Sequence, residues 1–196
     1  MMIYLFLQIL ITLGVNATTS SIVEQIDFSK TVTLEQIIKE EKALGRSVMP
    51  SPINVSLGHE YYPNIKGYDL QNPMVADYES TEGLGSSAEY FFTPDSIVRV
   101  FLTTWYESFD FSKQLKKTTP EDLIANKLLF QDKITELQNV LIEQLGQPYV
   151  NAAHKPFDAT SEFIQYKWKG AFNADLSVVF SNKAGYSRLR LLVFRD

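Results

Sequence analysis

TPEDLIANKLLFQDKITELQNVLIEQLGQP, residues 119–148, is the stretch of this chain that decides the fold. Thr119 offers a capping hydroxyl and Pro120 suits the first turn of a helix, while Gly146 supplies a stop. Between these signals, apolar residues recur on one side at helical spacing: Phe130, Ile134, Leu137, Leu141 and Leu145. The sequence therefore predicts a helix over Pro120 to Leu145 whose apolar side must be covered. A break near residues 125–127 is left open.

The residues after this helix alternate in the way that β-strands do. Segments 162–168, 174–180 and 188–195 carry period-two patterns and are separated by turn-rich residues. We predict three antiparallel strands, each with one buried face. The last strand carries apolar side chains on both faces around 191–194, which places it centrally in the sheet or under a helix.

A hairpin is predicted before the long helix. Segments 88–93 and 97–107 flank Pro94-Asp95-Ser96, where the proline presets φ and the aspartate can bond back to the backbone. A helix capped by Thr93 is the alternative for the second segment. The β-branched and aromatic residues of 97–106 favour a strand.

The N-terminal part contains a second helix, predicted from Leu34 to Leu44. Thr33 and Gln36 have the spacing of a capping box, Val32 and Ile37 that of a hydrophobic staple, and a glycine follows as the stop. The fold class predicted from these elements is α+β. It has a mainly antiparallel sheet, made of the hairpin and the C-terminal three-strand meander, packed on the long amphipathic helix, with the N-terminal helix in addition.

Residues 46–87 are punctuated by proline and glycine, and the sequence predicts mostly loop there, with one short strand at 53–57. So long a loop is uncommon in a compact domain. Three interpretations stay open: a functional surface, a loop wrapped over the core, or a misread pattern.

The first residues indicate export. Residues 1–17 combine a short apolar run with a small-residue ending at Val15-Asn16-Ala17, which is typical of a signal peptide, although an uncleaved anchor is the alternative. We divide the chain into the signal peptide (1–17), a flexible N-terminal arm (18–31) and a single domain (32–196). The mature chain is expected to have no transmembrane span, and its location to be periplasmic or extracellular. The absence of cysteine favours a bacterial source.

Composition excludes several classes of function. With no cysteine, the chain has no thiolate zinc site and no cysteine nucleophile. A net charge of −5 disfavours nucleic acid as a partner. The glycines at 83–88 lie between an acidic loop and a predicted strand, which is the wrong context for dinucleotide binding. We therefore assign no cofactor and no metal, since the acidic residues near Asp77 also lack the spacing of a calcium loop.

The aromatic and acidic residues of the loop region are the candidates for a ligand-binding site. They are His59, Tyr61, Tyr62, Tyr68, Asp69, Asp77, Tyr78 and Glu79. Tyrosine rings add contact area at low entropic cost and carboxylates accept hydrogen bonds, although the rings serve equally well to cap the core. A further lead is an anion-binding face formed by cations of the C-terminal strands, which are also an ordinary charged sheet surface: Arg188, Arg190, Arg195, Lys167 and Lys169.

The function predicted from this pattern is an exported, non-catalytic binding or interaction domain of the cell envelope. It would recognise a protein or a glycan through the aromatic and acidic loop region. The alternative is a hydrolase of an envelope polymer that uses His59 with a carboxylate from Asp69, Asp77 or Glu79. No catalytic residue is assigned, because sequence spacing across loops does not show whether such groups converge.

Overall fold

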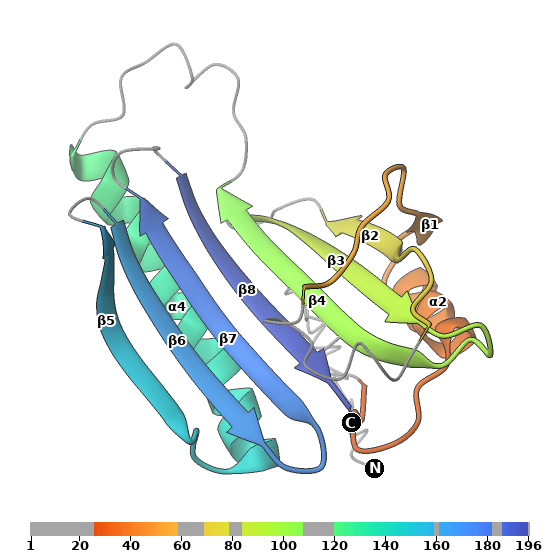
Figure 1. The fold of residues 1–196 in the computed structure, drawn as a ribbon. Coiled ribbons are helices and arrows are strands. Elements are labelled where there is room, and N and C mark those ends of the chain that lie inside the picture. Colours follow the sequence, from red (N-terminus) through yellow and green to blue (C-terminus); the bar gives the residue numbers. More distant parts are fainter. Residues whose placement is uncertain are drawn as a thin grey trace, which may run out of the picture.

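The computed structural model describes residues 26–58, 69–78, 84–107, 120–158, 161–181 and 186–195. Within these ranges the chain is α+β, with two helices and one mainly antiparallel sheet of eight strands (Figure 1), which confirms the predicted class. The elements are α2 (Leu34–Ala43), β1 (Met49–Pro50), β2 (Met74–Tyr78), β3 (Leu84–Phe92), β4 (Val98–Glu107), α4 (Pro120–Leu145), β5 (Val150–Asp158), β6 (Ser161–Lys169), β7 (Asn173–Ser181) and β8 (Tyr186–Phe194).

The strand order is β1-β2-β3-β4-β8-β7-β6-β5. Among the described elements, a helix is followed by four strands twice, first as α2 with β1 to β4 and then as α4 with β5 to β8. The two halves meet where β4 pairs with β8 in antiparallel register, with Thr103 opposite Leu191 at the middle of the paired segment. The last strand, predicted to lie centrally or under a helix, lies between β4 and β7 in the middle of the sheet.

Helix α4 runs without interruption from Pro120 to Leu145, as its caps predict, and the break near 125–127 does not occur. It ends at Gly146, whose φ of 79° is a conformation that glycine adopts at little cost. Figure 1 shows α4 behind β6, β7 and β8. The Phe130 ring meets the Phe180 ring edge-on at 6.0 Å, and the Trp168 indole N–H donates a hydrogen bond of 3.0 Å to the Gly146 carbonyl.

Helix α2 begins with the predicted capping box. The backbone N–H of Gln36 donates to the Thr33 hydroxyl at 3.2 Å, and the side-chain oxygen of Gln36 accepts from the backbone N–H of Thr33 at 2.8 Å. Ile37 is fully buried in the same core cluster as the apolar side of α4. Both helices therefore lie on one face of the sheet.

The hairpin of β3 and β4 is confirmed, with Ser96 in the turn at a φ of 63°. The helical alternative for residues 97–107 is wrong, because these residues pair with β3 on one side and β8 on the other. Strand β3 begins at Leu84, earlier than its apolar pattern indicates.

The prediction for residues 46–87 was partly wrong. Residues 53–57 are not a strand, whereas β1, β2 and the first residues of β3 are. Val55, Leu57 and Leu70 pack over Phe91 and neighbouring residues of β4 and β8, on the sheet face opposite the helices. The described part of this segment therefore fits two of the three interpretations: the pattern was misread where β1, β2 and β3 form, and residues 51–58 are a loop wrapped over the core.

Strand β5 is the other element that the sequence did not predict. It pairs with β6 at the sheet edge and contains Pro156, with register irregularities on either side of that residue. Proline and bulges are typical of edge strands, which they protect against pairing with another chain.

The predicted signal peptide and most of the predicted arm precede residue 26 and lie outside the described residues. At the end of the arm, Ile26 and Phe28 are buried in the core cluster. Neither of the two described helices is long and apolar enough to cross a membrane.

Candidate functional site

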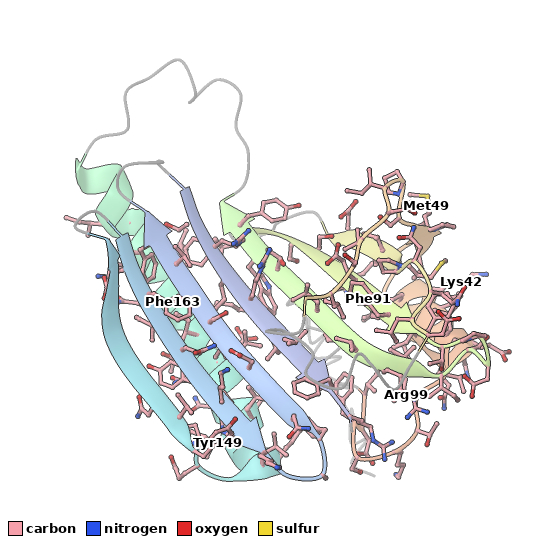
Figure 2. All side chains as sticks on the ribbon, viewed as in Figure 1. Lys42, Met49, Phe91, Arg99, Tyr149 and Phe163 are labelled. Carbon is pink, nitrogen blue, oxygen red and sulfur yellow. The ribbon has the colours of Figure 1, made fainter. Side chains whose placement is uncertain are left out.

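The face of the sheet turned away from α2 and α4, called the open face here, carries a polar row. Side chains alternate along each strand, and the strand registers align one residue from each of six strands on this face. Figure 2 views this face and shows Phe91 and Phe163 on it. The polar row consists of Asp77, Ser87, Thr104, Arg190, Ser177 and Gln165.

Arg190 lies in the middle of the polar row. Thr104 of β4 and Ser177 of β7 stand directly opposite it on the two neighbouring strands. All three side chains are partly exposed. The threonine and serine hydroxyls both donate and accept hydrogen bonds, so Arg190 has a polar neighbour on each adjacent strand.

Two carboxylates lie at the β2 and β3 end of the open face. Glu89 stands opposite Leu102 of β4, and Asp77 is diagonal to it on β2. Burial raises the pKa of Glu89; the negative charge of Asp77 also raises it and the positive charge of Arg190 lowers it. These three charges are therefore close enough to act on one another.

Tyr106 lies on the open face next to the polar row, opposite Gly85 of β3 and Arg188 of β8. A Cβ atom on Gly85 would come within 2.5 Å of the Tyr106 Cε2 atom, so any larger residue at position 85 would require the ring to move. Burial, followed by the negative charge of Asp77, raises the pKa of the Tyr106 hydroxyl. The ring therefore lies against the backbone of β3, with Asp77 nearby.

On the other side of the open face, Asp175 joins two neighbours on β6. Its carboxylate accepts hydrogen bonds of 2.9 and 3.0 Å from the Gln165 amide and pairs with the Lys167 ammonium group at 3.2 Å. The positive charge of Lys167 is thus paired with a carboxylate on the neighbouring strand. Arg195, another cation of the predicted anion-binding face, lies beyond the end of β8 and lines a different feature.

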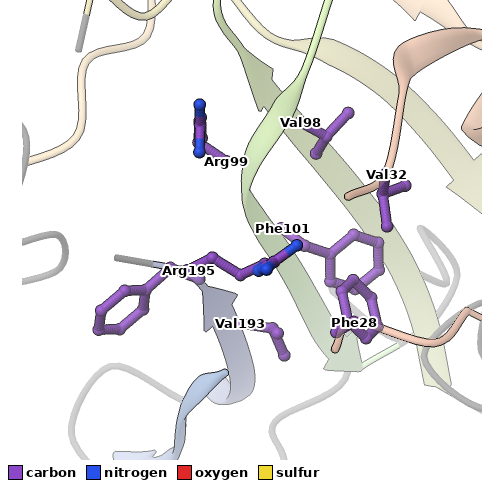
Figure 3. Close-up of a pocket in the computed structure, with 8 residues that line it drawn as sticks. Phe28, Val32, Val98, Arg99, Phe101, Val193 and Arg195 are labelled. Carbon is purple, nitrogen blue, oxygen red and sulfur yellow. The ribbon is translucent and has the colours of Figure 1, made fainter. Parts of the chain in front are cut away.

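That feature is a small pocket beside the N-terminal segment (Figure 3). Arg99 and Arg195 line it, and its apolar lining includes Phe28, Val32 and Val193. Its volume of about 10 Å³ is room for about one water molecule. The pocket is too small for a ligand.

The structure describes few of the predicted site residues. Asp77 lies in the polar row, while Asp69 is exposed in the segment before β2. The backbone of Tyr78 ends β2, and its side chain lies outside the described part. The other five predicted residues also lie outside the described residues: His59, Tyr61, Tyr62, Tyr68 and Glu79.

Sequence reasoning missed two residues of the open face, Glu89 and Tyr106, and named Arg190 only as a cation of the candidate anion-binding face. Trp105, the neighbour of Tyr106 in β4, is buried on the helix side, where the ammonium group of Lys133 lies 5.7 Å from its ring centroid. In the part of the chain that the structure describes, no cluster of three or more histidine or acidic side chains could hold a metal ion.

Comparison with known proteins gives no match: no protein-family model, no curated protein and no solved structure is significantly similar to this chain. The open face therefore has to be interpreted from its own chemistry.

Substitution of Glu89 tests the electrostatics of the open face. Its pKa in the folded state is raised above the ordinary value of 4.5, so ionised Glu89 lowers stability as the pH rises through 4.5 and the folded-state pKa. We expect Glu89→Gln to gain stability relative to the wild type between pH 4 and pH 7. Urea denaturation at several pH values measures this difference, with Glu143→Gln, an exposed position on α4, as the control for losing one carboxylate. A difference that shrinks with rising pH would contradict the assignment.

Proposed function

We propose that this chain is an exported, non-catalytic binding domain of the cell envelope that recognises a glycan or a protein through the open face of its sheet. The observation that carries the proposal is the position of Arg190. It is a charged side chain at the centre of a sheet, between two short hydroxyl side chains, and all three are partly exposed.

The composition of the polar row supports binding. The solvent-facing side of an antiparallel sheet is ordinarily polar, and on this sheet the polar side chains also form a continuous line of donors and acceptors. Here the row runs from Asp77 on β2 to Gln165 on β6. Asp77 also belongs to the site predicted from sequence, so the two lines of reasoning share one residue. Exported location rests on the sequence of residues 1–17.

Hydrolysis of an envelope polymer is the second candidate. Its support is the pair formed by Asp77 and Glu89, because two neighbouring carboxyl groups of which one has a raised pKa are the groups that glycoside hydrolysis needs. His59, which the sequence-based alternative invokes, lies outside the described residues.

Co-sedimentation with an envelope fraction from the secreting cell tests the proposal. The wild-type protein is expected to sediment with the envelope, and Ser177→Arg, which puts a long cationic side chain next to Arg190 in the polar row, to remain mostly in solution. Asn139→Arg makes the same change at an exposed position of α4 and is expected to behave as the wild type. Thr104→Arg provides a second blocking variant if Ser177→Arg does not fold.

The outcomes separate the candidates. Equal sedimentation of the wild type and both blocking variants, or no sedimentation at all, would contradict binding through the open face. Release of soluble sugar by the wild type, abolished by Asp77→Asn, would favour the hydrolase instead.

A further inference from the structure

The Tyr106 ring is the most specific feature of the open face. It rests on Gly85, whose hypothetical Cβ would lie 2.5 Å from Cε2 and 3.0 Å from Cζ of the ring. Tyr106 nevertheless remains 38% exposed. The ring therefore lies against the backbone of β3 while more than a third of the Tyr106 surface stays accessible to solvent. A ring fixed in this way loses little entropy when a ligand stacks on it.

Polar groups surround this ring on three strands. Arg188 stands opposite it on β8, Thr104 is the next residue of β4 on the same face, and the negative charge of Asp77 reaches its hydroxyl. They supply a cationic donor, a hydroxyl and an acceptor around one exposed aromatic face.

The charges of this part of the face balance. Asp77 and Glu89 are acidic, and Arg188 and Arg190 are basic. A strongly anionic ligand would approach two carboxylates, and a cationic ligand would approach two guanidinium groups. Balanced charge with many donors and acceptors instead complements a neutral ligand rich in hydroxyl groups.

We infer that Tyr106 is the stacking platform for a neutral glycan. A sugar ring has an apolar C–H face, which the electron-rich face of an aromatic ring attracts, and a rim of hydroxyls that both donate and accept hydrogen bonds. On Tyr106, that rim meets Asp77 as acceptor, Arg188 as donor and Thr104 as either. The inference rests on the proposed binding function and names its ligand class.

A purely structural role for the ring makes a different prediction. An aromatic side chain over a cross-strand glycine also stabilises a sheet by covering exposed backbone. Leucine covers Gly85 by apolar contact but presents no aromatic face, so Tyr106→Leu separates the two roles. Tyr106→Phe keeps the face and removes only the hydroxyl.

Titration calorimetry with cellohexaose, xylohexaose, mannohexaose and chitohexaose tests the inference on the full chain. The wild type is expected to bind at least one of them, Tyr106→Phe to bind within about threefold of the wild type, and Tyr106→Leu to bind roughly tenfold or more weakly. Tyr149→Leu changes a tyrosine that is 66% exposed outside this site and is expected to bind as the wild type does. Urea midpoints of all variants check that they are folded.

Failure of the inference and failure of the proposed function look different. No binding to any of the four hexasaccharides, or equal binding by Tyr106→Leu and the wild type, overturns the glycan inference. If envelope sedimentation still depends on Ser177 in that case, the binding function stands with another ligand. If it does not, both are overturned.

Discussion

Phe130→Ala is expected to lower the free energy of unfolding by about 3–5 kcal/mol, the usual range for removing a buried phenylalanine side chain. Phe130 is fully buried on the inner side of α4 and meets the Phe180 ring of β7 edge-on. The ammonium group of Lys127 lies 5.4 Å from the centroid of the same Phe180 ring. The substitution leaves a cavity between helix and sheet that these neighbours only partly fill.

Denaturation by urea, followed by circular dichroism, measures the loss. The matched control is Leu128→Ala, in the same helix but 56% exposed, which is expected to change stability by no more than about 0.5 kcal/mol. Similar small effects for both variants would mean that the inner side of α4 does not pack tightly on the sheet.

Arg46→Met is expected to cost about 3 kcal/mol or more, because it leaves a buried carboxylate without its cation. Glu41 of α2 is fully buried and accepts hydrogen bonds from the Tyr90 hydroxyl of β3 and from the Arg46 guanidinium group, the latter at 3.3 Å. Lys42→Met removes an exposed cation from the next position of α2 and serves as the control.

A double variant identifies the cause of that loss. Glu41→Gln keeps an oxygen that can accept from Tyr90 but removes the negative charge, so Arg46→Met combined with Glu41→Gln is expected to be more stable than Arg46→Met alone. Urea denaturation of the four members of this cycle measures the coupling. Purely additive losses would show that there is no coupling free energy between Glu41 and Arg46.

The elements that the sequence predicts well carry their own local signals. Helix α4 has a proline at its start and a glycine after its end, and α2 has its capping box, so their bounds follow from residues a few positions apart. Strand β8 is apolar on both faces around Leu191 because Leu191 belongs to the core beneath the helices and Leu192 to the cluster beneath Leu57 on the opposite face. These patterns need no knowledge of distant partners.

The elements that were missed depend on distant partners. In β2, the buried position is Ala76, a small side chain that gives little apolar signal, and the strand forms by pairing with β3. Strand β5 contains Pro156 and lies at the sheet edge, so its composition resembles a loop. In both cases the pairing with a neighbour, rather than local preference, makes the strand.

The sequence named Asp77 and Arg190, although for two different candidate surfaces, and the way in which the site is assembled depends on distant partners for the same reason. Glu89, Tyr106 and Arg190 belong to three strands, and only the registers of β3 with β4 and of β4 with β8 bring them to one face. A shift of one residue in either register would turn a strand's polar side chains toward the helices. Alternation alone predicts which residues share a strand face, but not which of them are neighbours.

The repeated order of one helix and four strands has a thermodynamic consequence. Thr104 belongs to the first half and Arg190 to the second, so the centre of the polar row exists only while the seam between β4 and β8 is closed. Any molecule that binds there favours the joined state over one in which the halves separate, by mass action. Ligand binding and the pairing of the two halves are therefore linked, so a ligand that contacts both β4 and β8 would stabilise their pairing.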